Sequence, residues 1–241
     1  MQRKCLLISN STLHGSGYLD HCADEIKNFL HPLSSLLFIP YARPGGITHE
    51  DYTNIAKKRF KQMNITLTGV QEHSNPQKAV DNAEALFIGG GNTFVLLSDL
   101  YKYKLIKIIS QKVFNGMPYI GTSAGSNVAC KTIKTTNDMP IIYPPSFDAI
   151  ELVPFNINPH YLDPDPHSTH KGETRETRIT EFHQYNNEYV VGLREGSMLH
   201  IINNKILLKG TTCARIFKKG TTPKEYHPGD NLTFLLKEPI E

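Results

Sequence analysis

Residues 117–130 read "MPYIGTSAGSNVAC", and this stretch decides how the first half of the chain is interpreted. A short apolar run ending at Ile120 meets "GTSAG" at residues 121–125, which matches the G-x-S-x-G pattern of a nucleophile elbow. In such a turn a strand passes directly into a helix, and small neighbours are needed because the chain passes close to itself. The pattern therefore predicts that Ser123 projects beyond the carboxyl end of a strand, where open α/β sheets bind ligands.

The residues on either side of this turn alternate between short apolar runs and longer amphipathic ones. Strands are expected at residues 5–9, 36–39, 65–70, 86–88 and 119–121. Helices are expected between them at residues 19–30, 49–63, 76–83 and 93–114. Thr48, with Asp51 three residues on, is expected to cap the second, and the last has a break near Lys102. Uniformly apolar strands that alternate with helices predict a parallel sheet covered by helices on both faces.

The second half of the chain has a different pattern. Residues 134–171 are rich in proline and predict a long loop, and long loops in compact domains are usually functional. A helix is expected at residues 173–184, and strands at residues 189–193, 198–202, 205–208, 214–217 and 232–236, with a hairpin turn at Asn203-Asn204. No repeat or domain boundary is visible, so residues 1–241 are expected to form a single α/β domain.

Composition excludes several classes of function. The chain has 26 Lys and Arg residues against 23 Asp and Glu residues, and a formal net charge of +3 spread along its length does not predict nucleic-acid binding. No apolar run is long enough to span a membrane, and the run at residues 5–8 is too short for a signal peptide. Four cysteines without C-x-x-C spacing are typical of reduced thiols, so we expect a cytoplasmic protein.

A second turn rich in small residues supports acyl-transfer chemistry. The sequence "LFIGGGNTF" places Gly89, Gly90 and Gly91 at the end of another expected strand. Consecutive glycines let backbone N–H groups point together at an anion, such as the oxyanion of acyl transfer. A dinucleotide loop is the weaker interpretation, because Phe94 stands where G-x-G-x-x-G requires its last glycine.

A nucleophilic serine needs an imidazole and a group that orients it. Of the eleven histidines, His160 has the most suitable setting, because it directly follows an apolar run inside the proline-rich segment. Asp138 and Glu195 both occupy loops after apolar or β-prone segments, and either carboxylate would fix the tautomer of His160. The spacing does not choose between them.

A metal site is the alternative chemistry for the same segment. Carboxylates and imidazoles are closely spaced there, at Asp163, Asp165, His167, His170 and Glu173. The segment has neither H-E-x-x-H nor a Cys–His pairing, and Asp-Pro pairs are common in turns. We therefore expect no metal and no other cofactor.

Seven blocks of the sequence resemble the peptidase E family of serine peptidases, the α-aspartyl dipeptidases. They occur in order between residue 5 and about residue 217, as "LLISNST", "FIGGGNTF", "YIGTSAGSNVAC", "TIKTTNDMPI", "INPH", "HKGETRETRI" and "GLREGS". The resemblance implies a three-layer α/β/α fold with a mainly parallel, flavodoxin-like sheet related to class I glutaminases, and additional antiparallel strands near the C-terminus. It also implies a cytosolic enzyme that hydrolyses Asp-Xaa dipeptides in α-linkage without a metal.

The same resemblance implies roles for individual residues. The serine of "GTSAG" is Ser123, the histidine of "INPH" is His160 and the glutamate of "GLREG" is Glu195. Asp138 remains an alternative partner of the imidazole. The backbone N–H groups of Gly91 and Ala124 would form the oxyanion hole.

Recognition of an aspartyl side chain calls for a cation, and a guanidinium group suits a carboxylate bidentately. Arg175 and Arg178 of "HKGETRETRI" are equally plausible as surface partners of Glu173 or Glu176, and the resemblance selects Arg175 as the substrate-binding residue. The segment "YLDPDPHST" after His160 departs from the family wording.

Other functions remain open at this point. A cyanophycinase-like β-aspartyl peptidase on the same scaffold, a metal-dependent hydrolase and a non-catalytic module that binds an aspartyl ligand are the alternatives. The sequence leaves the oligomeric state open between a monomer and a homodimer.

Overall fold

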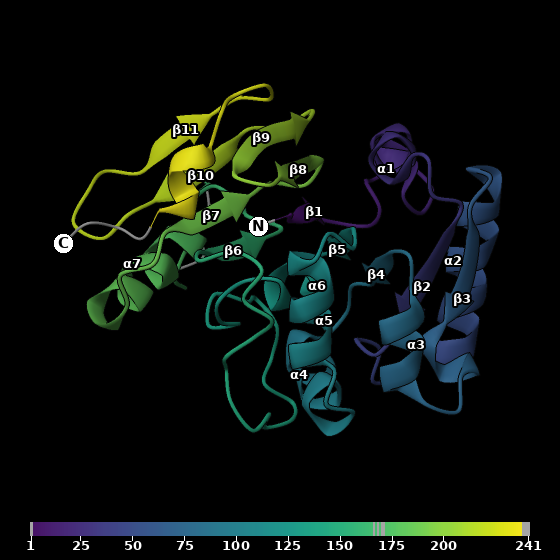
Figure 1. Cartoon of the computed structure of the whole chain (residues 1–241). Helices are drawn as coiled ribbons and strands as arrows, with labels where there is room; N and C mark the ends of the chain where they lie inside the picture. Colours follow the sequence, from purple (N-terminus) through teal and green to yellow (C-terminus); the bar gives the residue numbers. More distant parts are fainter. Residues whose placement is uncertain (1, 166, 168, 170–171, 238–241) are drawn as a thin grey trace.

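A seven-stranded sheet, with strand order β3-β2-β4-β5-β1-β8-β9, forms the centre of the protein (Figure 1). The computed structural model describes residues 2–165, 167, 169 and 172–237. Its parallel strands are β1 (Lys4–Ile8), β2 (Ser35–Ile39), β3 (Thr66–Gly69), β4 (Leu86–Ile88) and β5 (Tyr119–Thr122). Two antiparallel strands, β8 (Ser197–Ile202) and β9 (Lys205–Gly210), extend the sheet beyond β1. The central strands β1, β2, β4 and β5 are buried almost throughout because both faces are covered, whereas the edge strand β3 alternates exposed and buried residues.

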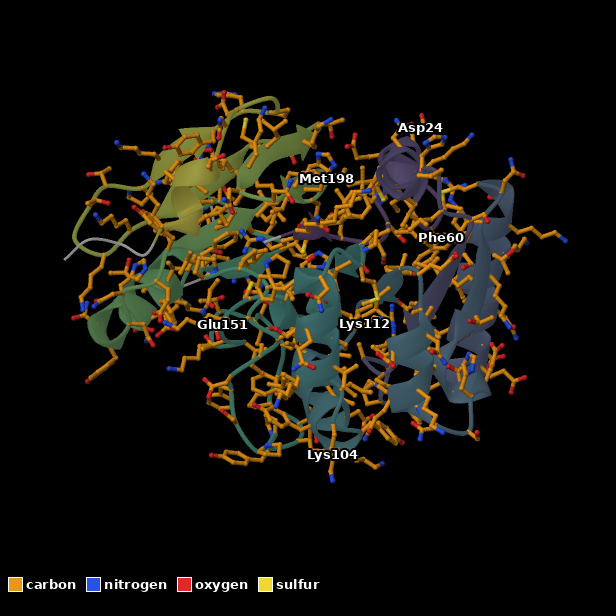
Figure 2. The ribbon with its side chains drawn as sticks, in the orientation of Figure 1. Asp24, Phe60, Lys104, Lys112, Glu151 and Met198 are labelled. Carbon is orange, nitrogen blue, oxygen red and sulfur yellow. The ribbon has the colours of Figure 1, made fainter. Side chains whose placement is uncertain are left out.

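Helices cover the two faces of this sheet, as the sequence predicts. On one face α1 (Ala23–Leu30), which follows the short helix η1 (Asp20–Cys22), and α2 (His49–Gln62) pack against alternate residues of the strands. The opposite face is covered by α3 (Pro76–Asn82), α4 (Thr93–Lys102) and α5 (Ile106–Phe114). Figure 2 shows Phe60 of α2 and Met198 of β8 in the interior, whereas Asp24 and Lys104 lie at the periphery.

The sequence also located details of these helices correctly. Thr48 caps α2, because its Oγ1 atom accepts a hydrogen bond of 3.0 Å from the backbone N–H of Asp51. The helical tract at residues 93–114 is broken between α4 and α5, close to the predicted position at Lys102. The predicted three-layer α/β/α fold with a mainly parallel sheet is confirmed.

A second sheet of four strands lies beside the first, in the order β11-β10-β7-β6 (Figure 1). It consists of β6 (Asn156–Pro159), β7 (Val190–Leu193), β10 (Ala214–Phe217) and β11 (Lys224–Tyr226). Helix α7 (Arg175–Tyr185) packs on it through Ile179, which contacts Val190 and Phe217. The turn that follows β7 leads directly into β8, so the chain passes from the second sheet into the first at residues 194–196.

The expected additional strands near the C-terminus are divided between the two sheets, because β7 and β10 belong to the second sheet and β8 and β9 to the first. The strand predicted at residues 232–236 is wrong: these residues form the 3₁₀-helix η3 (Thr233–Leu236). Leu235 of this helix and its N-cap residue Leu232 are both buried and lie three positions apart, which matches the 3₁₀ period. β11 was not predicted.

The segment expected to be a loop, residues 134–171, contains β6. The sequence did not predict this strand because two of its four residues, Asn156 and Asn158, are polar. In the structure both are buried and hydrogen-bonded. Pro159 is tolerated because β6 is an edge strand.

None of the helices in the described part of the chain combines the length and apolar character that crossing a membrane requires. All four cysteines are free thiols; Cys5, Cys22 and Cys130 are buried, and Cys213 is partly exposed.

Candidate active site

Ser123 lies on a strained turn between β5 and helix α6 (Ala124–Val128). Its backbone has φ 52° and ψ −108°, which a non-glycine residue adopts only when its surroundings enforce it. A Cβ atom on Gly125 would lie 2.2 Å from the Ile88 carbonyl oxygen, and one on Gly121 would lie 2.5 Å from the Gly125 carbonyl oxygen. Only glycine fits at these two positions, so the predicted elbow is formed by close approach of the backbone.

His160 is held at the end of β6 by the neighbouring ends of two other strands. Its backbone N–H donates to the Oγ atom of Ser9 at 3.0 Å, and that hydroxyl donates to the Leu193 carbonyl oxygen at 2.8 Å. The residue has φ 51°, in the left-handed region. In this position Nε2 of His160 lies 3.0 Å from Oγ of Ser123, within hydrogen-bonding distance.

Glu195 occupies the turn between β7 and β8 and contacts the other side of the same imidazole. Its Oε1 atom lies 2.6 Å from Nδ1 of His160. The turn is fixed by two hydrogen bonds: the Gly196 N–H donates to Oδ1 of Asn10 at 2.9 Å, and Oγ1 of Thr212 donates to the Glu195 carbonyl oxygen at 2.7 Å. The side chains of His160 and Glu195 are 40% and 46% exposed, so water and substrate have access to them.

Asp138, the other candidate partner of the imidazole, directs its carboxylate to the start of α4. Its Oδ2 atom accepts hydrogen bonds from the backbone N–H of Thr93 at 2.7 Å, from the Thr93 hydroxyl at 2.6 Å and from the Thr136 hydroxyl at 3.1 Å. An acidic side chain is favourable at a helix N-terminus. Geometry therefore assigns Asp138 to the first turn of α4 and Glu195 to His160.

The glycine loop after β4 packs directly against the elbow. A Cβ atom on Gly90 would lie 3.2 Å from the Cβ atom of Ser123. Gly91 has φ 146°, and a Cβ atom there would lie 2.1 Å from the Ala42 carbonyl oxygen. The loop and the first residue of α6, Ala124, thus bring the backbone N–H groups of Gly91 and Ala124 to the edge of the sheet that carries Ser123.

Arg175 is the first residue of α7 and lines a cavity of about 560 Å³. The lining also includes Asn137, Leu162, Asp163, Glu173 and Arg178. Among the described residues, no carboxylate forms an ion pair or hydrogen bond with Arg175, whereas Arg178 pairs with Glu173 at 3.6 Å. Burial lowers the pKa of Arg175, and the nearby Arg178 adds to this effect, but an arginine remains charged at neutral pH.

The carboxylates considered as metal ligands have other partners. Both oxygens of Asp163 bind Arg194, Asp165 accepts from the backbone N–H of His167, and Glu173 pairs with Arg178. Within the described ranges, no three His, Cys, Asp or Glu side chains come together to hold a metal ion. His170 lies outside the described residues.

Two residues that position the site were missed in the sequence. Ser9 is fully buried and joins the backbones of His160 and Leu193, and Asn10 is 1% exposed and binds the turn of Glu195. Their position in the sequence could have indicated this role, because these small polar residues directly follow the first apolar strand, at the end where open α/β sheets bind ligands.

A serine whose hydroxyl contacts an imidazole, which in turn contacts a carboxylate, is the arrangement that serine hydrolases use to activate their nucleophile. The chain belongs to this class of enzymes. Comparison with known proteins narrows the class, because the model of peptidase family S51 matches residues 5–209. The chain therefore belongs to peptidase family S51.

Individual relatives agree with this family along nearly the whole chain. "Peptidase E" of Streptomyces coelicolor is 48% identical over 231 residues, which cover 96% of this chain and 94% of that protein. "Probable alpha-aspartyl dipeptidase" of Drosophila melanogaster is 44% identical over 239 residues, 98% of each chain. The crystal structure of a peptidase from an acI-B1 Actinobacterium has the same fold, with a TM-score of 0.70 at 14% identity over 96% of this chain and 97% of that one.

Replacement of Ser9 tests whether its hydroxyl supports the site. In Ser9→Ala the N–H group of His160 and the carbonyl group of Leu193 lose their shared partner, so the free energy of unfolding should fall by about 1–3 kcal/mol. Urea denaturation measures this change. Ser74→Ala, at an exposed position, is the matched control and should shift stability by less than about 0.5 kcal/mol. Equal stability of the two variants would contradict the role of Ser9.

Proposed function

We propose that this chain is an α-aspartyl dipeptidase that hydrolyses Asp-Xaa dipeptides through Ser123, His160 and Glu195. The observation that carries the proposal is the continuous chain of contacts from Oγ of Ser123 to Nε2 of His160 at 3.0 Å and from Nδ1 to Glu195 at 2.6 Å. Arg175 has no ion pair with a carboxylate among the described residues, and this supports the choice of an acidic substrate. The names of the Streptomyces and Drosophila relatives support the same activity.

The first half of the reaction forms an acyl-enzyme. Ser123 Oγ attacks the carbonyl carbon of the scissile bond while Nε2 of His160 accepts the hydroxyl proton. Glu195 holds the proton of the imidazole on Nδ1 and stabilises the imidazolium ion that forms. The strained backbone of Ser123 keeps its hydroxyl in place, so little further ordering is needed when the substrate binds.

The oxyanion of the tetrahedral intermediate accepts hydrogen bonds from the N–H groups of Gly91 and Ala124. Loss of one such donor typically costs about 3 kcal/mol of transition-state stabilisation. The imidazolium ion of His160 then protonates the leaving amine, and water hydrolyses the acyl-enzyme with His160 as the general base.

Substrate selection follows from the charges around the cavity. Four carboxylates near Arg175 are engaged elsewhere, since Asp163 binds Arg194, Glu173 binds Arg178, Glu176 binds Arg215 and Asp138 binds Thr93. Arg175 forms no ion pair or hydrogen bond with a carboxylate in the described part of the chain, and the charge of Asp138 acts on it without such a contact. A guanidinium group in this state suits the side-chain carboxylate of an N-terminal aspartate, which it can bind bidentately.

Hydrolysis of Asp-Leu by the wild type and by Ser123→Ala tests the proposed activity. The wild type should release leucine from α-Asp-Leu, and the alanine variant should lose this activity because no other group replaces the nucleophile. Glu-Leu and β-Asp-Leu are the control substrates. Turnover of β-Asp-Leu in preference to α-Asp-Leu would favour the β-aspartyl peptidase, and tight binding without turnover would favour a binding module.

The choice between the two acidic residues is tested by isosteric variants. Glu195→Gln should lower kcat by about 10²-fold or more, because the imidazolium ion loses its counter-charge and the preferred tautomer. Asp138→Asn keeps an oxygen that can accept from Thr93, so its kcat should change much less. Steady-state kinetics with Asp-Leu distinguish them. A large loss of kcat in Asp138→Asn with near-normal Glu195→Gln would reverse the assignment.

Arg175 is tested by Arg175→Ala and Arg175→Lys. The first should lower kcat/KM for Asp-Leu by about 10²-fold or more, because the substrate carboxylate loses its partner. Lysine should restore part of the loss, since it supplies the charge without the planar fork. Arg178→Ala, in the same helix and paired with Glu173, is the matched control and should change kcat/KM far less. Normal hydrolysis by both Arg175 variants would remove this residue from the substrate site.

A further inference from the structure

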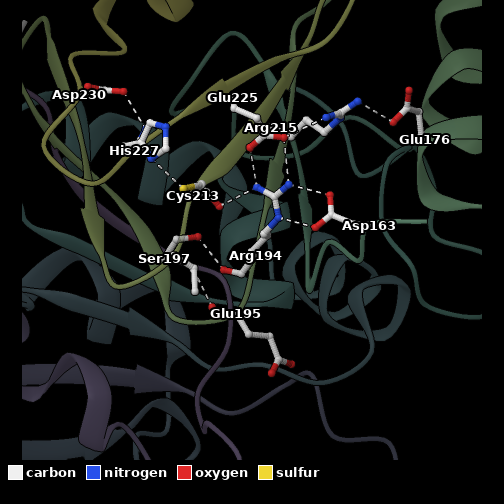
Figure 3. A network of polar contacts seen from close by, with 11 residues as sticks. Asp163, Glu176, Arg194, Glu195, Ser197, Cys213, Arg215, Glu225, His227 and Asp230 are labelled. Atoms are coloured by element: carbon white, nitrogen blue, oxygen red, sulfur yellow. Dashed lines mark hydrogen bonds and ion pairs between the residues drawn. The ribbon is translucent and has the colours of Figure 1, made fainter. Parts of the chain in front are cut away.

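Arg194 directly precedes Glu195, and its guanidinium group lies at the centre of an acidic network (Figure 3). All five of its N–H donors are used. Nε and Nη2 donate to the two oxygens of Asp163 at 2.8 and 2.6 Å, Nη1 and Nη2 donate to Glu225 at 2.8 and 3.0 Å, and Nη1 also donates to the Cys213 carbonyl oxygen at 3.1 Å. The guanidinium group lies 5.5 Å from the ring centroid of Tyr161. Figure 3 shows the side chains of Arg194 and Glu195 pointing in opposite directions.

The network continues to the helix that carries Arg175. Glu225 also accepts from Arg215 at 2.9 Å, and Arg215 pairs with Glu176 at 3.1 Å. Glu176 is the neighbour of Arg175 in the first turn of α7. Arg194 is therefore connected to both sides of the candidate site: to the turn of Glu195 through its own backbone, and to the start of α7 through Glu225 and Arg215.

Asp163 is the member of this network with a direct bearing on the substrate. It lines the same cavity as Arg175, and it carries the same carboxylate group as the side chain of an aspartyl substrate. A carboxylate tethered in the cavity acts at an effective concentration in the millimolar range, so a free Asp163 would compete with substrate for Arg175. Its charge would also repel an acidic substrate. Arg194 prevents both effects by binding both oxygens of Asp163.

The pairing of Asp163 is maintained at neutral pH. Hydrogen bonds from Arg194 hold the pKa of the Asp163 carboxyl group below its usual range, so this carboxylate stays ionised and paired until the solution becomes strongly acidic. Asp163 is 53% exposed and Arg194 is 18% exposed.

We infer that Arg194 is a positioning and specificity residue, which reserves Arg175 for the substrate carboxylate by binding Asp163 and which fixes the turn that carries Glu195. The inference rests on the proposed function, because it concerns the same aspartyl subsite. It assigns Asp163 the role of an internal competitor that is kept away from the cation. Substitution of Arg194 should then weaken substrate binding only in a protein that still has the Asp163 carboxylate.

The experiment is a double-variant cycle of Arg194→Gln and Asp163→Asn, measured with α-Asp-Leu. Arg194→Gln should raise KM about tenfold, because the released Asp163 competes at millimolar effective concentration, and should lower kcat, because the turn of Glu195 is loosened. Asp163→Asn alone should raise KM less than Arg194→Gln does, because it removes the competing carboxylate and leaves Arg194 in place. The double variant should recover a KM within about threefold of the wild type while kcat stays low. A KM in the double variant as high as in Arg194→Gln would overturn the inference.

A merely structural role of Arg194 would change the free energy of unfolding in parallel with KM, so urea denaturation of the wild type and the three variants separates the two roles. Circular dichroism checks that the variants fold. If Arg194→Gln does not fold, Arg194→Lys replaces it: lysine keeps a charge but cannot bind both carboxylates in parallel, so KM should rise less and should again be restored by Asp163→Asn. An unchanged KM in Arg194→Lys, or one that Asp163→Asn does not restore, would overturn the inference.

Binding without turnover separates this inference from the proposed function. In the Ser123→Ala background, calorimetric titration with aspartate should give a Kd that rises with Arg194→Gln and returns with the added Asp163→Asn. An unchanged Kd in Arg194→Gln, alongside normal Asp-Leu hydrolysis by the wild type, would overturn the inference and leave the proposed function intact. Absence of Asp-Leu hydrolysis by the wild type would overturn the proposed function itself.

Discussion

The hydroxyl group of Ser9 is the connection on which the geometry of the site depends. It lies fully buried at the end of β1 in the main sheet, accepts from the N–H of His160 after β6 and donates to the carbonyl oxygen of Leu193 at the end of β7. One oxygen atom thus fixes two strands of the second sheet against a strand of the first. The distances from His160 to Ser123 and to Glu195 follow from this docking, because the nucleophile belongs to one sheet and the imidazole to the other.

Backbone strain and charge come together at this boundary between the sheets. Ser123 and His160 have positive φ angles, and close packing or a buried hydrogen bond enforces each of them. The charged groups are arranged so that most carboxylates near the site already have donors, and Arg175 forms no ion pair with any described carboxylate. This arrangement agrees with the proposed binding of an acidic substrate by Arg175.

The sequence predicted the parts of the structure that depend on local patterns. Apolar strands, the cap at Thr48 and the elbow at Ser123 were correct because each is encoded within a few neighbouring residues. β6 was missed because its buried asparagines obtain their partners from residues 132–137, which no local pattern reveals. The spacing left the choice between Asp138 and Glu195 open for a similar reason, because both follow apolar segments and only the docking of the two sheets decides which carboxylate reaches His160.

The order of these contacts along the chain has a consequence for biosynthesis. Ser9 leaves the ribosome well before its partner Leu193, which lies 184 positions further along the chain. The strands β1 to β5, with the serine, are synthesised before the glutamate, because synthesis proceeds from the N-terminus. On the proposed mechanism, a nascent chain that ends before residue 195 therefore holds the serine without the full set of residues that activate it, and hydrolysis becomes possible only after residue 195 has been synthesised.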